Sequence, residues 1–177
     1  MRQIGFWMAD AKIEARFIDP MLLLSAEKLP EGGSWAYELK LDVFRAVAIK
    51  TGGRVHLRSR NDKDLAPRFS TIAQALAAMP DETAIDGEIV ALDESGRPSF
   101  SALQHQGAST AALFYYVFDV MILAGTDVMS EPLTVRRALL QERVLADRCS
   151  SVFRHWRQRS VYSPTCPKQK AGAGARG

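Results

Sequence analysis

Residues 37–46, YELKLDVFRA, place one lysine between two carboxylates. Side chains along a β-strand alternate between its two faces, so Glu38, Lys40 and Asp42 share one face and the apolar residues share the other. A lysine amine in this setting can act as a nucleophile or bind a phosphate. The pattern also fits a solvated strand face with a weak ion pair worth about 0–1 kcal/mol. Taken alone, so short a motif favours the second interpretation.

The elements that must position this lysine follow from hydrophobic periodicity and turn residues. The paired glycines at residues 51–54 predict a tight hairpin turn, and Ser99 is a candidate N-cap for a short helix that runs to Gln104. The remaining elements are strands over residues 35–41, 43–50, 55–59, 84–92 and 113–123, and helices over residues 67–79 and 131–147. Residues 1–18 show no clear period and are interpreted as a lead segment. The sequence therefore predicts an α+β fold.

Composition describes an ordinary soluble chain. With 177 residues, 47% apolar and 24% charged, the protein has room for one domain with a sizeable core. No apolar run near the middle of the chain is long enough to span a bilayer. Cys149 and Cys166 lack the spacing of a zinc site or a disulfide framework, which predicts a reducing cytoplasmic location. No membrane partner is expected.

The charge is unevenly distributed along the chain. Residues 150–177 hold six basic residues and no acidic ones, so residues 1–149 carry 17 − 20 = −3 although the whole chain is +3. A segment with this composition and a Gly/Ala-rich end is typical of disorder. We therefore interpret residues 149–177 as a disordered basic tail. The net positive charge says little about the folded part.

Four segments, in order and spacing, resemble ATP-dependent DNA ligases, with the ligase module of bacterial end-joining ligases as the closest resemblance. They are WAYELKLDVFRA, LRSRNDKDLAPRF, AIDGEIVALDESGRPSFSALQ and FYYVFDVMIL, and they cover about residues 17–145. The resemblance implies a nucleotidyltransferase fold of antiparallel sheets flanked by helices. It also reverses the interpretation of Lys40, because four motifs in order are far more specific than one.

The resemblance implies that Lys40 attacks the α-phosphate of ATP and forms a covalent lysyl-AMP intermediate. Glu38 corresponds to the residue that accepts a hydrogen bond from the adenine amino group, and Leu39 is included among the nucleotide-binding positions. Asp42 supports the lysine element. Arg45 offers a planar fork for a phosphate or ribose oxygen.

Three further residues receive roles from the resemblance. Arg60 corresponds to a contact with the ribose or the nick phosphate. Glu88 corresponds to a ribose-binding or metal-binding glutamate, next to Gly87, which permits close backbone approach. Phe118 corresponds to the aromatic ring that stacks on adenine.

Two features depart from the family pattern. Val43 stands where the family has glycine, and a β-branched residue resists backbone shapes that glycine allows. The chain also leaves the pattern near Arg148, before a strand with a further metal-binding glutamate and a strand with two phosphate-binding lysines. We therefore expect a C-terminally truncated, incomplete adenylation domain over residues 19–148, with impaired activity.

The resemblance implies ATP and Mg²⁺ or Mn²⁺ as cofactors and nicked or broken duplex DNA as substrate in repair and recombination. DNA-end-binding repair proteins are the implied partners, and the implied location is the bacterial nucleoid. Two alternatives stay open. One is a non-catalytic ligase remnant, and the other is a nucleotidyltransferase of the RNA ligase or mRNA-capping type, which shares the lysine chemistry.

Overall fold

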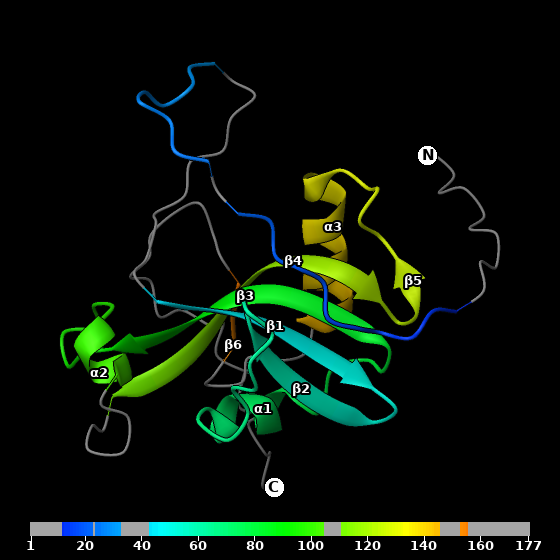
Figure 1. Cartoon of the computed structure of the whole chain (residues 1–177), viewed down its shortest axis with the longest axis horizontal. Coiled ribbons are helices and arrows are strands. Elements are labelled where there is room, and N and C mark those ends of the chain that lie inside the picture. The colour runs from blue at the N-terminus through cyan, green and yellow to red at the C-terminus, as the bar shows by residue number, and fades with distance from the viewer. Residues whose placement is uncertain (1–11, 23, 33–42, 105–110, 146–152, 156–177) are drawn as a thin grey trace, which may run out of the picture.

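A computed structural model of the chain describes residues 12–22, 24–32, 43–104 and 111–145, together with the backbone of residues 153–155. Its centre is one sheet in the order β2-β1-β3-β4-β5, with neighbouring strands antiparallel, and β6 pairs in parallel with β4 (Figure 1). The strands are β1 Phe44–Thr51, β2 Arg54–Ser59, β3 Thr83–Leu92, β4 Ala112–Leu123, β5 Thr126–Asp127 and β6 Phe153–His155. The antiparallel sheet with few helices confirms the predicted α+β class.

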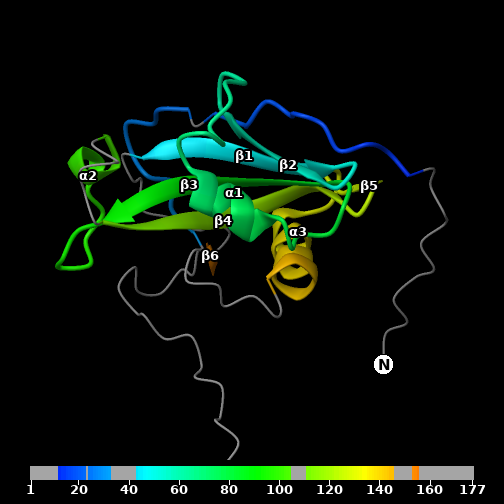
Figure 2. The ribbon, with the colours of Figure 1, turned by 90° about the horizontal axis from the view of Figure 1, so that it is seen from below.

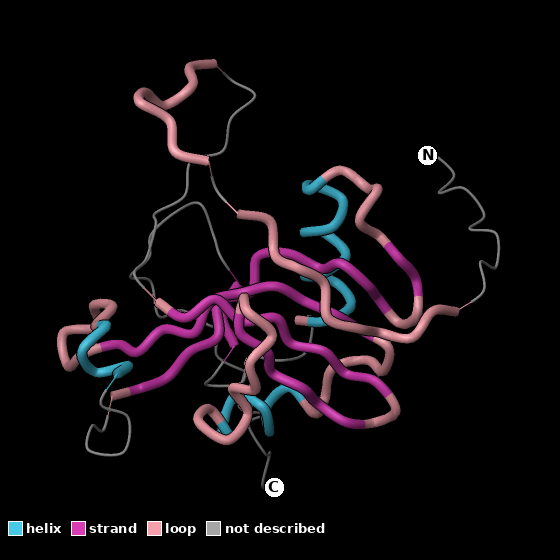
Figure 3. The backbone as a smooth tube through the Cα atoms, viewed as in Figure 1, coloured by secondary structure: helices cyan, strands magenta, loops and turns pink. Residues whose placement is uncertain are grey.

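The helices are short, and loops connect most of the elements (Figure 3). They are α1 Ser70–Leu76, α2 Phe100–Gln104 and α3 Leu133–Leu139, which continues into the π-helical turn η1, Leu140–Val144. No helix in these described ranges is long and apolar enough to cross a membrane.

The β1–β2 hairpin turns at Gly52 and Gly53, where both residues have positive φ values of 53° and 74°. Two consecutive positive φ values suit the right-handed twist of paired strands, and glycine adopts them without strain. Thr51 pairs with Arg54 across this turn. The hairpin predicted from the two glycines is therefore present.

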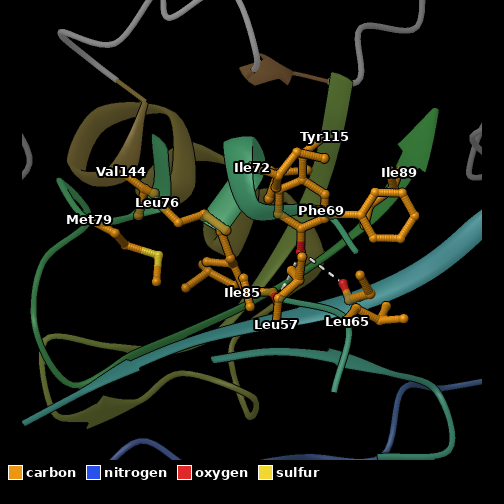
Figure 4. Close-up of a cluster of buried hydrophobic side chains, with 14 of the residues drawn as sticks. Leu57, Leu65, Phe69, Ile72, Leu76, Met79, Ile85, Ile89, Tyr115 and Val144 are labelled. Atoms are coloured by element: carbon orange, nitrogen blue, oxygen red, sulfur yellow. Dashed lines mark hydrogen bonds between the residues drawn. The ribbon is translucent and has the colours of Figure 1, made fainter. Parts of the chain in front are cut away.

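One face of the sheet packs against α1 and α3, which lie on the same side in the edge-on view (Figure 2). Phe69, Ile72 and Leu76 contribute fully buried side chains from α1 and its N-cap (Figure 4). Tyr115 of β4 is also buried, and its hydroxyl donates a hydrogen bond of 2.8 Å to the Ala46 carbonyl of β1. These contacts form the larger hydrophobic core.

Residues 12–18, which we call the N-terminal strap, cover part of the other face. Ala15 is 3% exposed and belongs to a second apolar cluster, against which Ile13, Phe17 and Ile18 pack. The sheet residues of this cluster are Val47, Ile49, Ala84, Met121 and Ile122. The Ile13 amide also donates to the Gly125 carbonyl at 2.9 Å. The strap therefore packs against the sheet, and it lies within residues 1–18, which are interpreted from the sequence as a lead segment.

Several predicted elements have different bounds in the structure. The predicted helix over residues 67–79 shortens to 70–76. The predicted helix over residues 131–147 begins at residue 133 and is described as far as residue 144, with residues 146 and 147 outside the described ranges. The predicted strand over residues 35–41 lies outside the described residues. Strand β6 falls inside the predicted disordered tail, where it pairs with residues 115–117 of β4. Residues 153–155 form a strand because they pair with β4, and strand formation depends on tertiary context more than on local composition.

Candidate functional site

Arg45, Asp86 and Phe118 come together from β1, β3 and β4 in the middle of the sheet. The Arg45 guanidinium donates two hydrogen bonds to the Asp86 carboxylate, from Nε to Oδ1 at 2.7 Å and from Nη2 to Oδ2 at 2.6 Å. The guanidinium carbon of Arg45 also lies 4.6 Å from the centroid of the Phe118 ring, over its face. Because strand side chains alternate, Arg45 and Asp86 lie on the same sheet face as Val47 and Ala84, the face that the N-terminal strap partly covers.

The ion pair is shielded from solvent, with side-chain exposures of 24% for Arg45 and 6% for Asp86. Burial raises the pKa of the Asp86 carboxyl, and the hydrogen bonds and charge of Arg45 oppose this shift. Burial lowers the pKa of Arg45, but Asp86 and the nearby charge of Glu88 outweigh it, so the net shift is upward. The bidentate geometry at these distances is that of a charged pair.

Glu88 lies next to this pair on the same face of β3. Its register partner on β1 is Arg45, and its partner on β4 is Tyr116. The Glu88 side chain is half-buried. The site therefore contains two carboxylates two residues apart on one strand. One of them, Asp86, forms the ion pair with Arg45.

A β-bulge directs Phe118 into the site. Asp86 pairs with Asp119 and Gly87 pairs with Val117, so Phe118 is an extra residue in β4 without a register partner in β3. A bulge bends its strand and redirects a side chain, and bulges occur often beside functional sites. The Phe118 carbonyl accepts a hydrogen bond of 3.2 Å from Arg137 Nε of α3. The ring is thus placed by the bulge and its backbone is held by a helix.

Gly87 between the two carboxylates is required by close packing. An added Cβ atom would lie 2.5 Å from the Tyr116 carbonyl oxygen and 2.7 Å from the Tyr115 ring. Contacts this short do not occur for real Cβ atoms. The glycine therefore lets the Tyr115 ring cross beneath β3 and reach the Ala46 carbonyl of β1.

Asp119, which follows Phe118, has a structural contact. Arg136 of α3 donates to both of its carboxylate oxygens, from Nε and Nη2 at 2.8 Å each. The hydrogen bond to Asp119 is the main cause that raises the pKa of Arg136, burial opposes it, and the charge of Asp119 adds to the increase. The Asp119–Arg136 pair fastens α3 to β4 immediately beside the site.

The structure brings together three of the site residues predicted from the sequence, namely Arg45, Glu88 and Phe118. Arg60 is exposed directly after β2, whose last residue Ser59 pairs with Ala46, so it lies at the same end of the sheet as Arg45. Val43 is half-buried and packs against the larger core. The other predicted residues, Lys40, Glu38, Leu39 and Asp42, lie outside the described residues.

Sequence reasoning did not assign Asp86 a partner. The available signal was the spacing of Asp86 and Glu88 around Gly87, which places both acids on one strand face. That pattern identifies buried carboxylates but does not identify the strand that supplies the balancing charge. The pairing with Arg45 depends on the β1–β3 register, in which Arg45 faces Glu88 and Val47 faces Asp86.

The described residues contain no group of three or more His, Cys, Asp or Glu side chains that could hold a metal ion by themselves. Both Asp86 oxygens accept hydrogen bonds from Arg45, and Glu88 supplies a second carboxylate on the same strand face. Mg²⁺ is commonly held by one or two carboxylates together with substrate phosphates. The donor set therefore fits a cation that binds together with a nucleotide.

Comparison with known proteins gives a consistent result. Residues 20–163 match a family model described as "ATP dependent DNA ligase domain". The multifunctional non-homologous end joining protein LigD of Pseudomonas aeruginosa is 38% identical over 122 residues, which are 67% of this chain and 14% of that protein. DNA ligase C2 of Mycolicibacterium smegmatis is 37% identical over 141 residues, which are 73% of this chain and 39% of that protein.

Solved structures show the same similarity. A mycobacterial DNA ligase D, described as complexed with ATP and MES, superposes with a TM-score of 0.54 at 31% identity and covers 66% of this chain and 38% of that one. The ligase domain of LigD from M. tuberculosis gives a TM-score of 0.53 at 32% identity, with the same coverage. The chain thus spans well under half the length of these relatives.

Proposed function

Because this chain belongs to the ATP-dependent DNA ligase family, we propose that it carries the nucleotide-binding part of such an enzyme and forms lysyl-AMP at Lys40. The family match covers residues 20–163, most of the chain. The proposed substrate of the first step is ATP, and the proposed acceptor of the AMP group is the 5′-phosphate at a nick or break in duplex DNA. The relatives named for non-homologous end joining support the second assignment.

The observation that carries the proposal is the cluster of Arg45, Asp86, Glu88 and Phe118 on one face of the sheet. The ring offers a stacking surface for a purine base, and Glu88 offers a carboxylate for a ribose hydroxyl or for a cation on the phosphates. Lys40 precedes Val43 by three residues. A chain of that length spans at most about 11 Å, which limits the distance between Lys40 and Val43.

The proposed step is a displacement at phosphorus. The neutral Lys40 amine forms a bond to the α-phosphorus of ATP, the bond from that phosphorus to the bridging oxygen breaks, and pyrophosphate leaves. The nitrogen then loses a proton to solvent and becomes the amide nitrogen of a phosphoramidate. Splitting phosphodiester formation through this covalent intermediate replaces one difficult step by easier ones. A divalent cation, Mg²⁺ or Mn²⁺, would supply charge stabilisation on the phosphate oxygens.

The experiment that tests the proposal looks for AMP on one residue. The purified 177-residue chain is incubated with ATP and Mg²⁺, digested, and analysed by mass spectrometry for a peptide that carries AMP on Lys40. The matched controls are Lys40→Arg, which keeps the charge but not the reactive amine, and Lys50→Arg. Lys50 donates to the Ala77 and Met79 carbonyls and lies away from the cluster.

We expect the modified peptide in the wild type and in Lys50→Arg, and its loss in Lys40→Arg. Parallel incubation with GTP separates the DNA ligase assignment from a capping-type enzyme, because a capping enzyme would transfer GMP to the lysine. A chain that remains unmodified with either nucleotide would support a non-catalytic remnant and overturn the proposal.

A further inference from the structure

We propose that Asp86 is a positioning residue for the adenine base: it holds the Arg45 guanidinium against one face of Phe118, so that the base stacks on the other face. The proposal rests on the proposed function and deepens it. Asp86 acts through Arg45, and Arg45 lies over the ring that receives the base.

The Asp86 carboxylate fixes the orientation of the guanidinium as well as its position. Two parallel hydrogen bonds, at 2.7 and 2.6 Å, define the plane of the guanidinium group, which a single contact would leave free to rotate. The carboxylate itself is 6% exposed and belongs to β3, which pairs with a strand on each side. The pair therefore provides a rigid support across β1 and β3.

The Phe118 ring is set against this support from the third strand. The bulge removes Phe118 from the regular β3–β4 register, and Arg137 holds its carbonyl at 3.2 Å. A cation over the ring face, 4.6 Å from the centroid, is attracted by the ring quadrupole. An aromatic ring has two faces, and the guanidinium lies over one of them, so the proposal places the base against the other.

This arrangement assigns Arg45 a contact different from the phosphate or ribose contact that the family resemblance implies. Its Nε and Nη2 groups both donate to Asp86. A ring that is already held in place needs little ordering when a base stacks on it, and preorganisation of this kind increases affinity. The expected consequence of losing Asp86 is therefore weaker recognition of the base, with the contacts to phosphate retained.

The test compares ligands with and without a base. Isothermal titration calorimetry measures the Kd of ATP and of inorganic tripolyphosphate, each with Mg²⁺, for the wild type, Asp86→Asn, Phe118→Leu and the double variant. We expect Asp86→Asn to weaken ATP binding about tenfold and to leave tripolyphosphate binding unchanged. Because Asp86 acts through the ring, it should have no further effect on ATP affinity in the Phe118→Leu background.

Arg136→Gln is the matched control, because it breaks an ion pair of the same bidentate geometry next to the site. We expect a lower melting temperature for this variant with an unchanged ATP Kd. Equal loss of ATP and tripolyphosphate binding in Asp86→Asn would show a general structural role and overturn the inference. Additive effects of Asp86→Asn and Phe118→Leu would also overturn it. If the wild type binds tripolyphosphate but not ATP, or neither ligand, the proposed function fails together with the inference.

Discussion

At the scale of single residues, Gly87 is the position where the site depends most directly on the absence of a side chain. Its neighbours in space, the Tyr116 carbonyl and the Tyr115 ring, occupy the volume that a Cβ atom would need. Tyr115 is fully buried, and its hydroxyl donates a hydrogen bond to the Ala46 carbonyl. The ring cannot move aside without losing that hydrogen bond.

We predict that Gly87→Ala lowers the free energy of unfolding by about 1–3 kcal/mol, the usual cost of overpacking a filled core. Chemical denaturation of the wild type and the variant measures the difference. Ala112, exposed at the start of β4, gives a control in Ala112→Gly, where no packed atom is added. A Gly87→Ala variant as stable as the wild type would show that β3 and β4 separate easily at this point.

Lys40 and Phe118 are predicted site residues because the four motifs, in order and spacing, resemble those of a known family. The Arg45–Asp86 pair was not identified, because 41 residues separate its members and the strand register decides which acid meets the arginine. The bulge at Phe118 also left no local signal, since it is defined by the mismatch between two strands. The sequence therefore proposes candidate site residues but does not predict the contacts that Arg45 and Phe118 make in the fold.

At the scale of elements, Glu82 connects three segments at the end of the sheet distant from Arg45. Its carboxylate accepts hydrogen bonds from the Ala15 amide at 2.7 Å, the Gly52 amide at 3.1 Å and the Thr51 hydroxyl at 2.9 Å. Its carbonyl accepts from the Gly125 amide at 2.7 Å. The N-terminal strap, the β1–β2 turn and the β4–β5 turn thus meet at one residue, which adopts a positive φ of 51°.

The hydrogen bond from the Ala15 amide, followed by those from Gly52 and Thr51, lowers the pKa of Glu82 below its ordinary value of 4.5. A carboxyl with a lowered folded-state pKa stabilises the fold above the unfolded pKa, and this contribution is lost as the pH falls through the folded value. We predict that Glu82→Gln is less stable than the wild type at neutral pH and that the difference shrinks below about pH 4.

Thermal unfolding of both proteins between pH 7 and pH 3 measures this difference. Glu142→Gln removes the same charge at an exposed position of η1 and serves as the control. A difference between wild type and Glu82→Gln that stays constant over the whole range would contradict the prediction.

The regular elements were largely predictable, because their apolar residues repeat with the period of a strand or a helix. The N-terminal strap was not, because its residues have no regular secondary structure and its stability comes from contacts with β1, β3 and β4. Strand β6 was missed for a related reason, since its partner lies in β4 and its own three residues carry little pattern.

At the scale of the whole molecule, the sheet has apolar residues on both faces, and the two faces are covered in different ways. Helices α1 and α3 cover one face, while the N-terminal strap covers part of the other. We predict that deletion of residues 1–18 lowers the melting temperature by roughly 10 °C, because it exposes the cluster around Val47 and Ile122 to water.

A point variant separates loss of packing from loss of chain length. Ala15→Asp introduces a charge at a position 3% exposed and should destabilise strongly, whereas Arg16→Ala changes an exposed neighbour and should have little effect. Melting curves that are the same for wild type, the deletion and Ala15→Asp would show that the strap contributes nothing to the folded domain.

The strap also has a consequence for the order in which the chain acquires its structure. The Ile13 amide donates a hydrogen bond to the Gly125 carbonyl. During synthesis, the strap is therefore made more than a hundred residues before the residue that it contacts. Contacts this distant in sequence close large loops and form slowly. Until β4 and β5 are complete, Ile13, Phe17 and Ile18 have no sheet face to cover, and exposed apolar segments of nascent chains are prone to aggregation. Refolding yield should therefore depend on protein concentration more strongly than it would for a domain of this size that closes locally.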